Sequence, residues 1–128
     1  MNPVLIKKYF LIFGFFFISG IAGVYGVNPA WFARTFFGIV ELNTNFAHIL
    51  RAVMCLYVGF GLFWLVSAFN AATRNIAILT MIVFGAGLLT GRLISFMVDG
   101  LPSPLLQSYT AIEFVLIPIA YWVYRLPE

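Results

Sequence analysis

Four long apolar stretches, separated by short polar segments, dominate this chain of 128 residues. They run from about 5 to 26, 46 to 69, 74 to 98 and 104 to 125. Each stretch has close to the 20 or so mostly apolar residues that a membrane-spanning helix needs. The pattern therefore predicts an all-α membrane protein, a four-transmembrane-helix bundle that forms a single domain over residues 1–128.

The long connection between the first two stretches carries a helix signal of its own. Asn28-Pro29 combines a capping side chain with a proline suited to the first helical position. Four aromatic residues and Arg34 follow within residues 31–37. We expect a short helix at the membrane interface, with its aromatic side toward the lipid. A lid over a pocket below is the alternative interpretation.

The composition agrees with a membrane protein. Hydrophobic residues make up 63% of the chain and charged residues 9%, whereas about half of an ordinary soluble domain is apolar. The net charge of +3 is dispersed and forms no basic cluster, so we expect no nucleic-acid partner. Cys55 is the only cysteine, which excludes an internal disulfide.

Basic residues near the helix ends suggest an orientation. Lys7 and Lys8 form a basic start to the first stretch, as in a signal peptide, but the apolar run after them continues to Val27 and is longer than a signal-peptide core. We therefore expect a retained helix. With four spans, Arg74 and Arg125 fall on the same side as the two lysines, which predicts that both termini are cytoplasmic.

Glycine spacing indicates where helices could approach closely. Gly20, Gly23 and Gly26 recur every three residues, and Gly87 and Gly91 are four apart. In lipid, small residues at such spacing allow helix backbones to pack together. We expect close helix contacts at these positions.

Five ionisable side chains interrupt the apolar stretches or their outer ends: His48, Arg51, Arg92, Asp99 and Glu113. A charge at the centre of a membrane helix costs roughly 2.5–3.5 kcal/mol on insertion scales, so such residues face partners rather than lipid. Counted along the helices from the outer side, Arg51 lies roughly 8 Å deep and Glu113 roughly 12 Å deep. All five charges are thus predicted in the outer half of the membrane.

Helical spacing groups these charges into stripes, because residues three and four apart share a helix face. The second helix has Asn45, His48, Arg51, Cys55 and Gly59, the third has Arg92, Ser95 and Asp99, and the fourth has Tyr109 and Glu113. If the stripes face one another, the bundle contains a polar pocket open to the outside. The candidate ligand-binding residues are Arg51, Arg92, Glu113, His48, Asp99, Asn45, Ser95 and Tyr109.

The chemistry of these residues favours an anion. An arginine fork matches the carboxylate of Glu113, and the second arginine is then held by Asp99 or free to attract a lipid phosphate or another anion. No second His, Cys or carboxylate lies at ligand spacing beside His48, so we predict no metal. No nucleophile–base motif or phosphate loop is present either, and we assign no catalytic residue and no cofactor.

Three segments resemble a known family. Residues 45–54, followed by 56–57, resemble the second-helix signature of the bacterial family called domain of unknown function 4345 (DUF4345). Residues 91–95 and 99–102 resemble its third-helix signature, and Glu113 matches the acidic position of its fourth helix. The resemblance implies a small four-helix protein of the bacterial inner (plasma) membrane, without a known activity, substrate or cofactor.

Three functions remain open from the sequence. The leading hypothesis is a non-enzymatic binding or accessory protein whose outward-facing polar pocket holds an anionic lipid headgroup or a small amphiphile, with membrane lipids as partners. The second is a small structural subunit packed on a larger membrane complex, or a homo-oligomer. The third is a membrane enzyme that uses Glu113 as acid or base.

Overall fold

The computed structural model describes all residues 1–128, and every regular element in it is a helix. The helices are α1 (Pro3–Gly26), α2 (Pro29–Phe37), α3 (Thr44–Ala68), α4 (Ala71–Val98) and α5 (Pro104–Arg125). All but α2 are long and apolar enough to cross a membrane. This confirms the predicted fold class, a bundle of four transmembrane helices with a short helix between the first two.

The helices begin at signals that the sequence makes plain. The side-chain oxygen of an asparagine accepts a hydrogen bond from a backbone N–H of the first turn in four of the five helices, and proline occupies the first turn of three. Such caps satisfy N–H groups that have no partner within the helix. The capping residues are Asn2, Asn28, Asn43 and Asn70.

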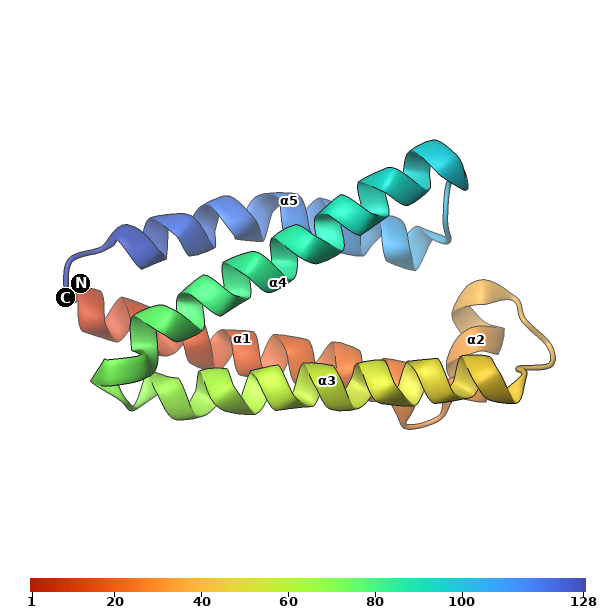
Figure 1. Cartoon of the computed structure of the whole chain (residues 1–128), viewed down its shortest axis with the longest axis horizontal. Helices are drawn as coiled ribbons and strands as arrows, with labels where there is room; N and C mark the ends of the chain where they lie inside the picture. The colour runs from red at the N-terminus through yellow and green to blue at the C-terminus, as the bar shows by residue number, and fades with distance from the viewer.

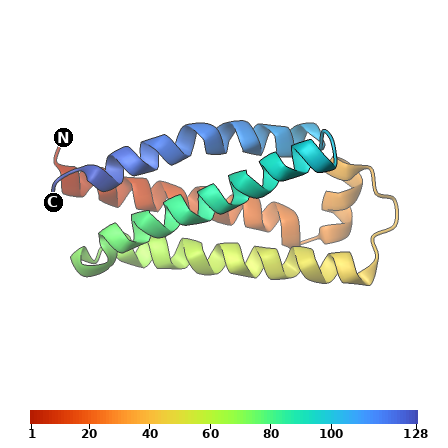
Figure 2. The same ribbon diagram turned by 45° about the horizontal axis from the view of Figure 1, so that its top comes forward.

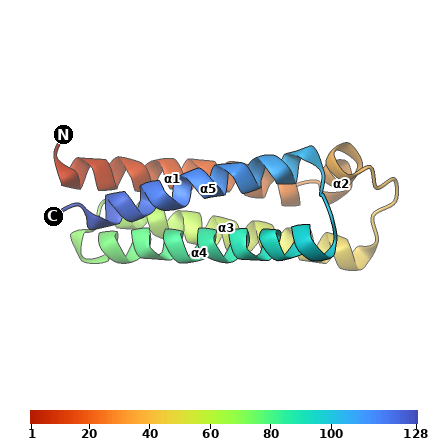
Figure 3. The same ribbon diagram turned by 90° about the horizontal axis from the view of Figure 1, so that it is seen from above.

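The four long helices form two pairs that diverge at one end (Figure 1). Helix α1 packs along α3, and α5 packs along α4. Helix α4 starts beside the end of α3 and runs obliquely away from it, so its far end lies away from α3 (Figure 1). Both chain termini lie at the end where the pairs meet, which we call the terminal end (Figure 3). Helix α2 and the α4–α5 turn lie at the opposite end, the loop end (Figure 2).

Aromatic side chains form much of the core. Leu50, Tyr57 and Trp64 follow one another at intervals of seven residues, two helical turns, and all are buried on the inner side of α3. The indole N–H of Trp64 donates a hydrogen bond to the hydroxyl of Thr80 on α4 at 3.0 Å. Only 22 of 128 residues are buried, and the remaining surface is rich in exposed apolar side chains, as lipid contact requires.

Most of the predicted glycine contacts are wrong. A Cβ added at Gly20, Gly23, Gly87 or Gly91 would meet nothing within 4 Å, whereas one at Gly26 would overlap the Met54 side chain of α3. Of the three predicted α1 glycines, only Gly26, at the loop end of the helix, lies close to α3. Spacing along a helix shows which residues share a face, but not whether that face meets a neighbour.

Helix α2 forms where the Asn-Pro signal predicts it, but its aromatic residues do not all face outward. Trp31 is 48% exposed, whereas Phe32 is fully buried. The Phe32 ring packs edge-on against Tyr25 with centroids 4.8 Å apart. The prediction of an aromatic side turned toward lipid is thus wrong for Phe32, because the open loop end of the bundle offers it a dry aromatic surface. Helix α2 covers the loop end of the core.

Candidate functional site

An arginine–glutamate pair joins α4 to α5 in the loop half of the bundle. Nε of Arg92 donates a hydrogen bond to each carboxylate oxygen of Glu113, both at 3.1 Å. The two side chains are 18% and 14% exposed, respectively. The sequence had left open which arginine holds Glu113, and the structure assigns Arg92. Both oxygens of Glu113 therefore lie against the Arg92 guanidinium.

Three tyrosines surround the Arg92 guanidinium. The ring of Tyr109 lies 5.7 Å from Cζ of Arg92, within the range of a cation–π contact. The Tyr25 side chain faces the same guanidinium, and its ring lies 6.2 Å from that of Tyr109 and 6.1 Å from that of Tyr57. The sequence predicts Tyr109 as a site residue, but it does not single out Tyr25 or Tyr57. Their position inside apolar helices could have identified them, because a buried tyrosine hydroxyl usually needs a hydrogen-bond partner.

A groove opens between α3 and α4 where the helix pairs diverge. Its volume is about 540 Å³. The α4 wall is polar and contains Arg92, Ser95 and Asp99, while Tyr25 and Leu50 belong to the apolar wall opposite. Gly87 and Gly91 of α4, which contact no other helix, also line this groove. Phe37 at the end of α2 lines it as well. These glycines widen the groove instead of bringing two helices together.

A second, mostly apolar crevice meets the groove at Arg92. It has a volume of about 100 Å³, and its lining extends over α1, α3, α4 and α5. Tyr57, Leu88 and Arg92 line both spaces, and Glu113 lines the crevice. Arg92 therefore lies between a groove with polar side chains on its α4 wall and a more apolar crevice. This arrangement presents charge and apolar surface side by side, as an amphiphile does.

The predicted stripe on α3 does not face this groove. Asn45, His48 and Arg51 are exposed on the outside of the bundle. Nη1 of Arg51 donates a hydrogen bond at 3.2 Å to the carbonyl of Gly26, the last residue of α1, where a cation also interacts favourably with the helix dipole. The structure thus separates these three residues from Arg92 and Glu113, and a ligand-binding role for them stays a prediction.

The other predicted polar residues lie along the groove. The Ser95 hydroxyl donates to Oδ2 of Asp99 at 2.7 Å within α4, so this carboxylate pairs with its own helix and holds neither arginine. No group of three or more His, Cys, Asp or Glu side chains lies close enough together to bind a metal ion.

These features define a small multi-pass membrane protein with an ion pair in the loop half of its helix bundle. The family model for the domain of unknown function DUF4345 matches residues 6–124, and the chain belongs to this family. The resemblance seen in the sequence is thereby confirmed. Comparisons with curated proteins and with solved structures give no match.

Proposed function

We propose that this protein is a non-enzymatic binding or accessory protein whose groove holds an anionic lipid headgroup or another small amphiphile. The position of Arg92 carries the proposal, because its guanidinium lies in the wall shared by the groove and the apolar crevice. A charged head beside Arg92 would leave an apolar tail next to the crevice. Ligand sites of this kind are concave and mostly apolar, with a few polar groups that fix orientation.

The hydrogen bonding of Arg92 supports an anionic head. Its bonds to Glu113 come from Nε, so the carboxylate does not occupy the two terminal nitrogens, although the Tyr25 side chain also faces the guanidinium. A phosphate or carboxylate can accept from both in the planar geometry that distinguishes arginine from lysine. Glu113 meanwhile offsets part of the cost of keeping the guanidinium away from water in the free protein.

We further propose that the groove faces the outside of a bacterial inner membrane. At the loop end and along the groove, three basic and three acidic side chains cancel, so four basic residues and one acid at the terminal end account for the net charge of +3. This asymmetry favours cytoplasmic termini. Cysteines introduced at Asn2 and Phe36 in a Cys55→Ser chain would test it with a membrane-impermeant thiol reagent. Labelling of residue 2 from outside intact cells would reverse the orientation.

Native mass spectrometry of the purified protein in mild detergent tests ligand binding. We expect a co-purifying amphiphile in the wild type and roughly tenfold less of it in Arg92→Lys, because lysine lacks the planar fork but can still pair with Glu113. Arg34→Lys is the matched control, since Arg34 is exposed on α2 and lines neither space. Absence of any bound molecule from the wild type, or full retention by Arg92→Lys, would contradict the proposal.

A structural subunit is the second candidate, supported by the outer face of α3. Asn45, His48 and Arg51 are exposed there, and a Cβ at Gly59 on the same stripe would meet nothing within 4 Å. A helix of a larger complex would bury such a face by close packing. The mass of the particle isolated in mild detergent distinguishes the two candidates, because a lone monomer argues against a subunit role.

A further inference from the structure

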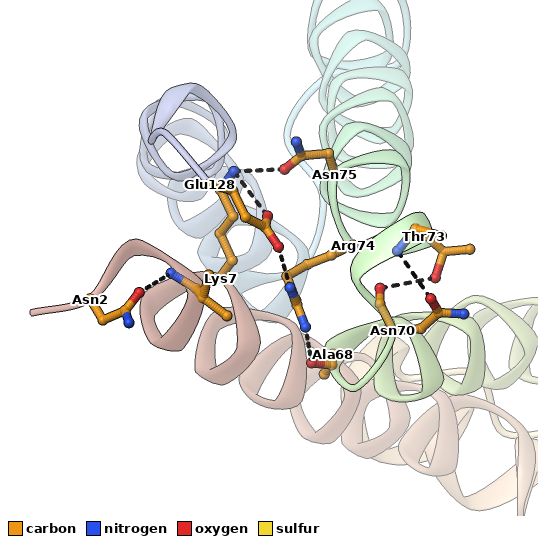
Figure 4. Close-up of polar contacts among 10 residues, drawn as sticks. Asn2, Lys7, Ala68, Asn70, Thr73, Arg74, Asn75 and Glu128 are labelled. Carbon is orange, nitrogen blue, oxygen red and sulfur yellow. Dashed lines mark hydrogen bonds and ion pairs between the residues drawn. The ribbon is translucent and has the colours of Figure 1, made fainter.

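A second cluster of charged groups lies at the terminal end, away from the groove (Figure 4). It joins Lys7 of α1, Arg74 of α4 and Glu128 of the tail after α5. Nζ of Lys7 donates a hydrogen bond to Oδ1 of Asn75 at 2.7 Å and lies 3.4 Å from Oε2 of Glu128. Nη1 of Arg74 pairs with the other carboxylate oxygen of Glu128. One carboxylate thus serves two cations.

Both cations are buried to an unusual degree. Lys7 is 0% exposed and Arg74 is 6% exposed, whereas charged residues are almost never fully buried unless paired. Nη2 of Arg74 donates to the carbonyl of Ala68, at the end of α3, at 3.2 Å, but its buried Nε has no partner. The cluster therefore keeps an excess positive charge and an unused buried donor.

The two cations and the carboxylate differ in how firmly they are held. Lys7 and Arg74 lie within the first two turns of long helices, whereas α5 ends at Arg125 and Glu128 follows in a non-helical tail. Pro127 prevents the helix from continuing, because it lacks an N–H donor and clashes with the preceding turn. The cationic part of the cluster is thus fixed by the bundle, whereas its carboxylate belongs to a non-helical segment that can move without unfolding a helix.

We propose that Lys7 and Arg74 form a binding site for a phosphate group, which Glu128 occupies as a competing internal anion. A phosphate carries more negative charge or more acceptor oxygens than a carboxylate, so it can serve both cations and the unpaired Nε of Arg74. The net charge of the whole protein lies at this end, where it would attract anionic headgroups. The phosphate source is either a phospholipid headgroup or a free phosphate ion.

Glu128→Gln tests the competition, because it removes the tail charge and leaves the tail length unchanged. In native mass spectra with added phosphatidylglycerol, we expect this variant to retain about fivefold more of that lipid than the wild type, because the competing carboxylate no longer pairs with the two cations. Phosphatidylcholine retention should rise less, because its choline cation offsets the charge of its phosphate. Glu41→Gln is the matched control, because it raises the net charge equally but lies in the exposed loop at the opposite end.

Two further measurements locate the site and its natural ligand. Adding Arg74→Gln to the Glu128→Gln chain should abolish the gain in phosphatidylglycerol retention. A mobility label at Leu126→Cys, in a Cys55→Ser chain that keeps Glu128, should report release of the tail when phosphatidylglycerol is added. In phosphatidylcholine nanodiscs, stabilisation of Glu128→Gln by inorganic phosphate would identify a free ion, and stabilisation by phosphatidylglycerol alone would identify a lipid. An equal gain in Glu41→Gln, a gain that survives Arg74→Gln, or a tail that stays immobile would overturn the proposal.

Discussion

The ion pair between α4 and α5 makes a quantitative prediction about stability. Replacing Glu113 by Met removes the carboxylate but keeps a side chain of similar length, so Arg92 loses both of its 3.1 Å hydrogen bonds to that carboxylate. Two unit charges about 4 Å apart interact by about 4 kcal/mol at an effective dielectric constant of 20. The residual exposure of 18% and 14% reduces this value, and we expect Glu113→Met to lower the free energy of unfolding by about 2–3 kcal/mol.

The two single substitutions should differ in cost. Arg92 keeps its positive charge at any working pH, because a guanidinium cannot be deprotonated in a protein. It therefore remains an unpaired cation in Glu113→Met. A carboxyl group left alone in Arg92→Met can instead become neutral by binding a proton. We expect about 1–2 kcal/mol for Arg92→Met, and less than about 1 kcal/mol for the double substitution, which leaves no unpaired charge.

Reversible unfolding in mixed micelles, followed by tryptophan fluorescence and circular dichroism, measures all four free energies. The expected coupling energy is about 3 kcal/mol. Asp99→Asn serves as a control, because Asp99 is exposed and pairs with Ser95 on its own helix; we expect a change within about 0.5 kcal/mol. A double substitution that costs as much as the two single ones together would refute the pairing as the reason that these charges are tolerated.

Two further predictions concern the loop end of α1. Gly26→Ala should lower the free energy of unfolding by about 1–3 kcal/mol, because its Cβ would overlap Met54. Gly23→Ala has free space around its Cβ and should be neutral or stabilising. The same unfolding assay compares the two variants, and equal effects would contradict the packing argument. Arg51→Gln should cost about 1 kcal/mol through the lost hydrogen bond to the Gly26 carbonyl and should leave ligand retention unchanged if the groove alone binds the amphiphile.

The number and type of helices could be predicted because the bilayer imposes them on the sequence. Every backbone polar group in hydrocarbon needs an internal partner, so a 20-residue apolar run is read as a helix. The Asn28-Pro29 signal marked the start of α2 for a local reason, because the asparagine side chain accepts from the Trp31 N–H at 3.1 Å. The depth of a residue in the membrane also follows from its position along its own helix, which is why Arg92 and Glu113 could be placed at a shared level.

Which side of each helix faces its neighbours, and which distant residues pair, could not be predicted in the same way. The rotation of α3 follows from the burial of Tyr57 and Trp64 against neighbouring helices, which one sequence does not specify. Arg51 can lie on the outer surface because it is close enough to the helix end to reach the Gly26 carbonyl. The cluster of Lys7, Arg74 and Glu128 joins residues far apart in the chain, and the sequence showed Lys7 and Arg74 only as basic residues near helix ends.

The placement of side-chain hydrogen bonds explains why the groove lies at the loop end. Bonds that cross between the two helix pairs lie in the terminal half: Lys7 to Asn75, Arg74 to Ala68, and Trp64 to Thr80. In the loop half, the Arg51 bond to Gly26 stays within the α1–α3 pair, and the Arg92 bonds to Glu113 stay within the α4–α5 pair. There the pairs meet through aromatic rings such as Tyr25 and Tyr109, whose contacts are less directional than hydrogen bonds. The pairs are therefore held together at the terminal end, and they can separate at the loop end without breaking either pair. An amphiphile entering beside Arg92 would need to displace aromatic contacts, the contact between Tyr25 and the Arg92 guanidinium, and the cover formed by α2.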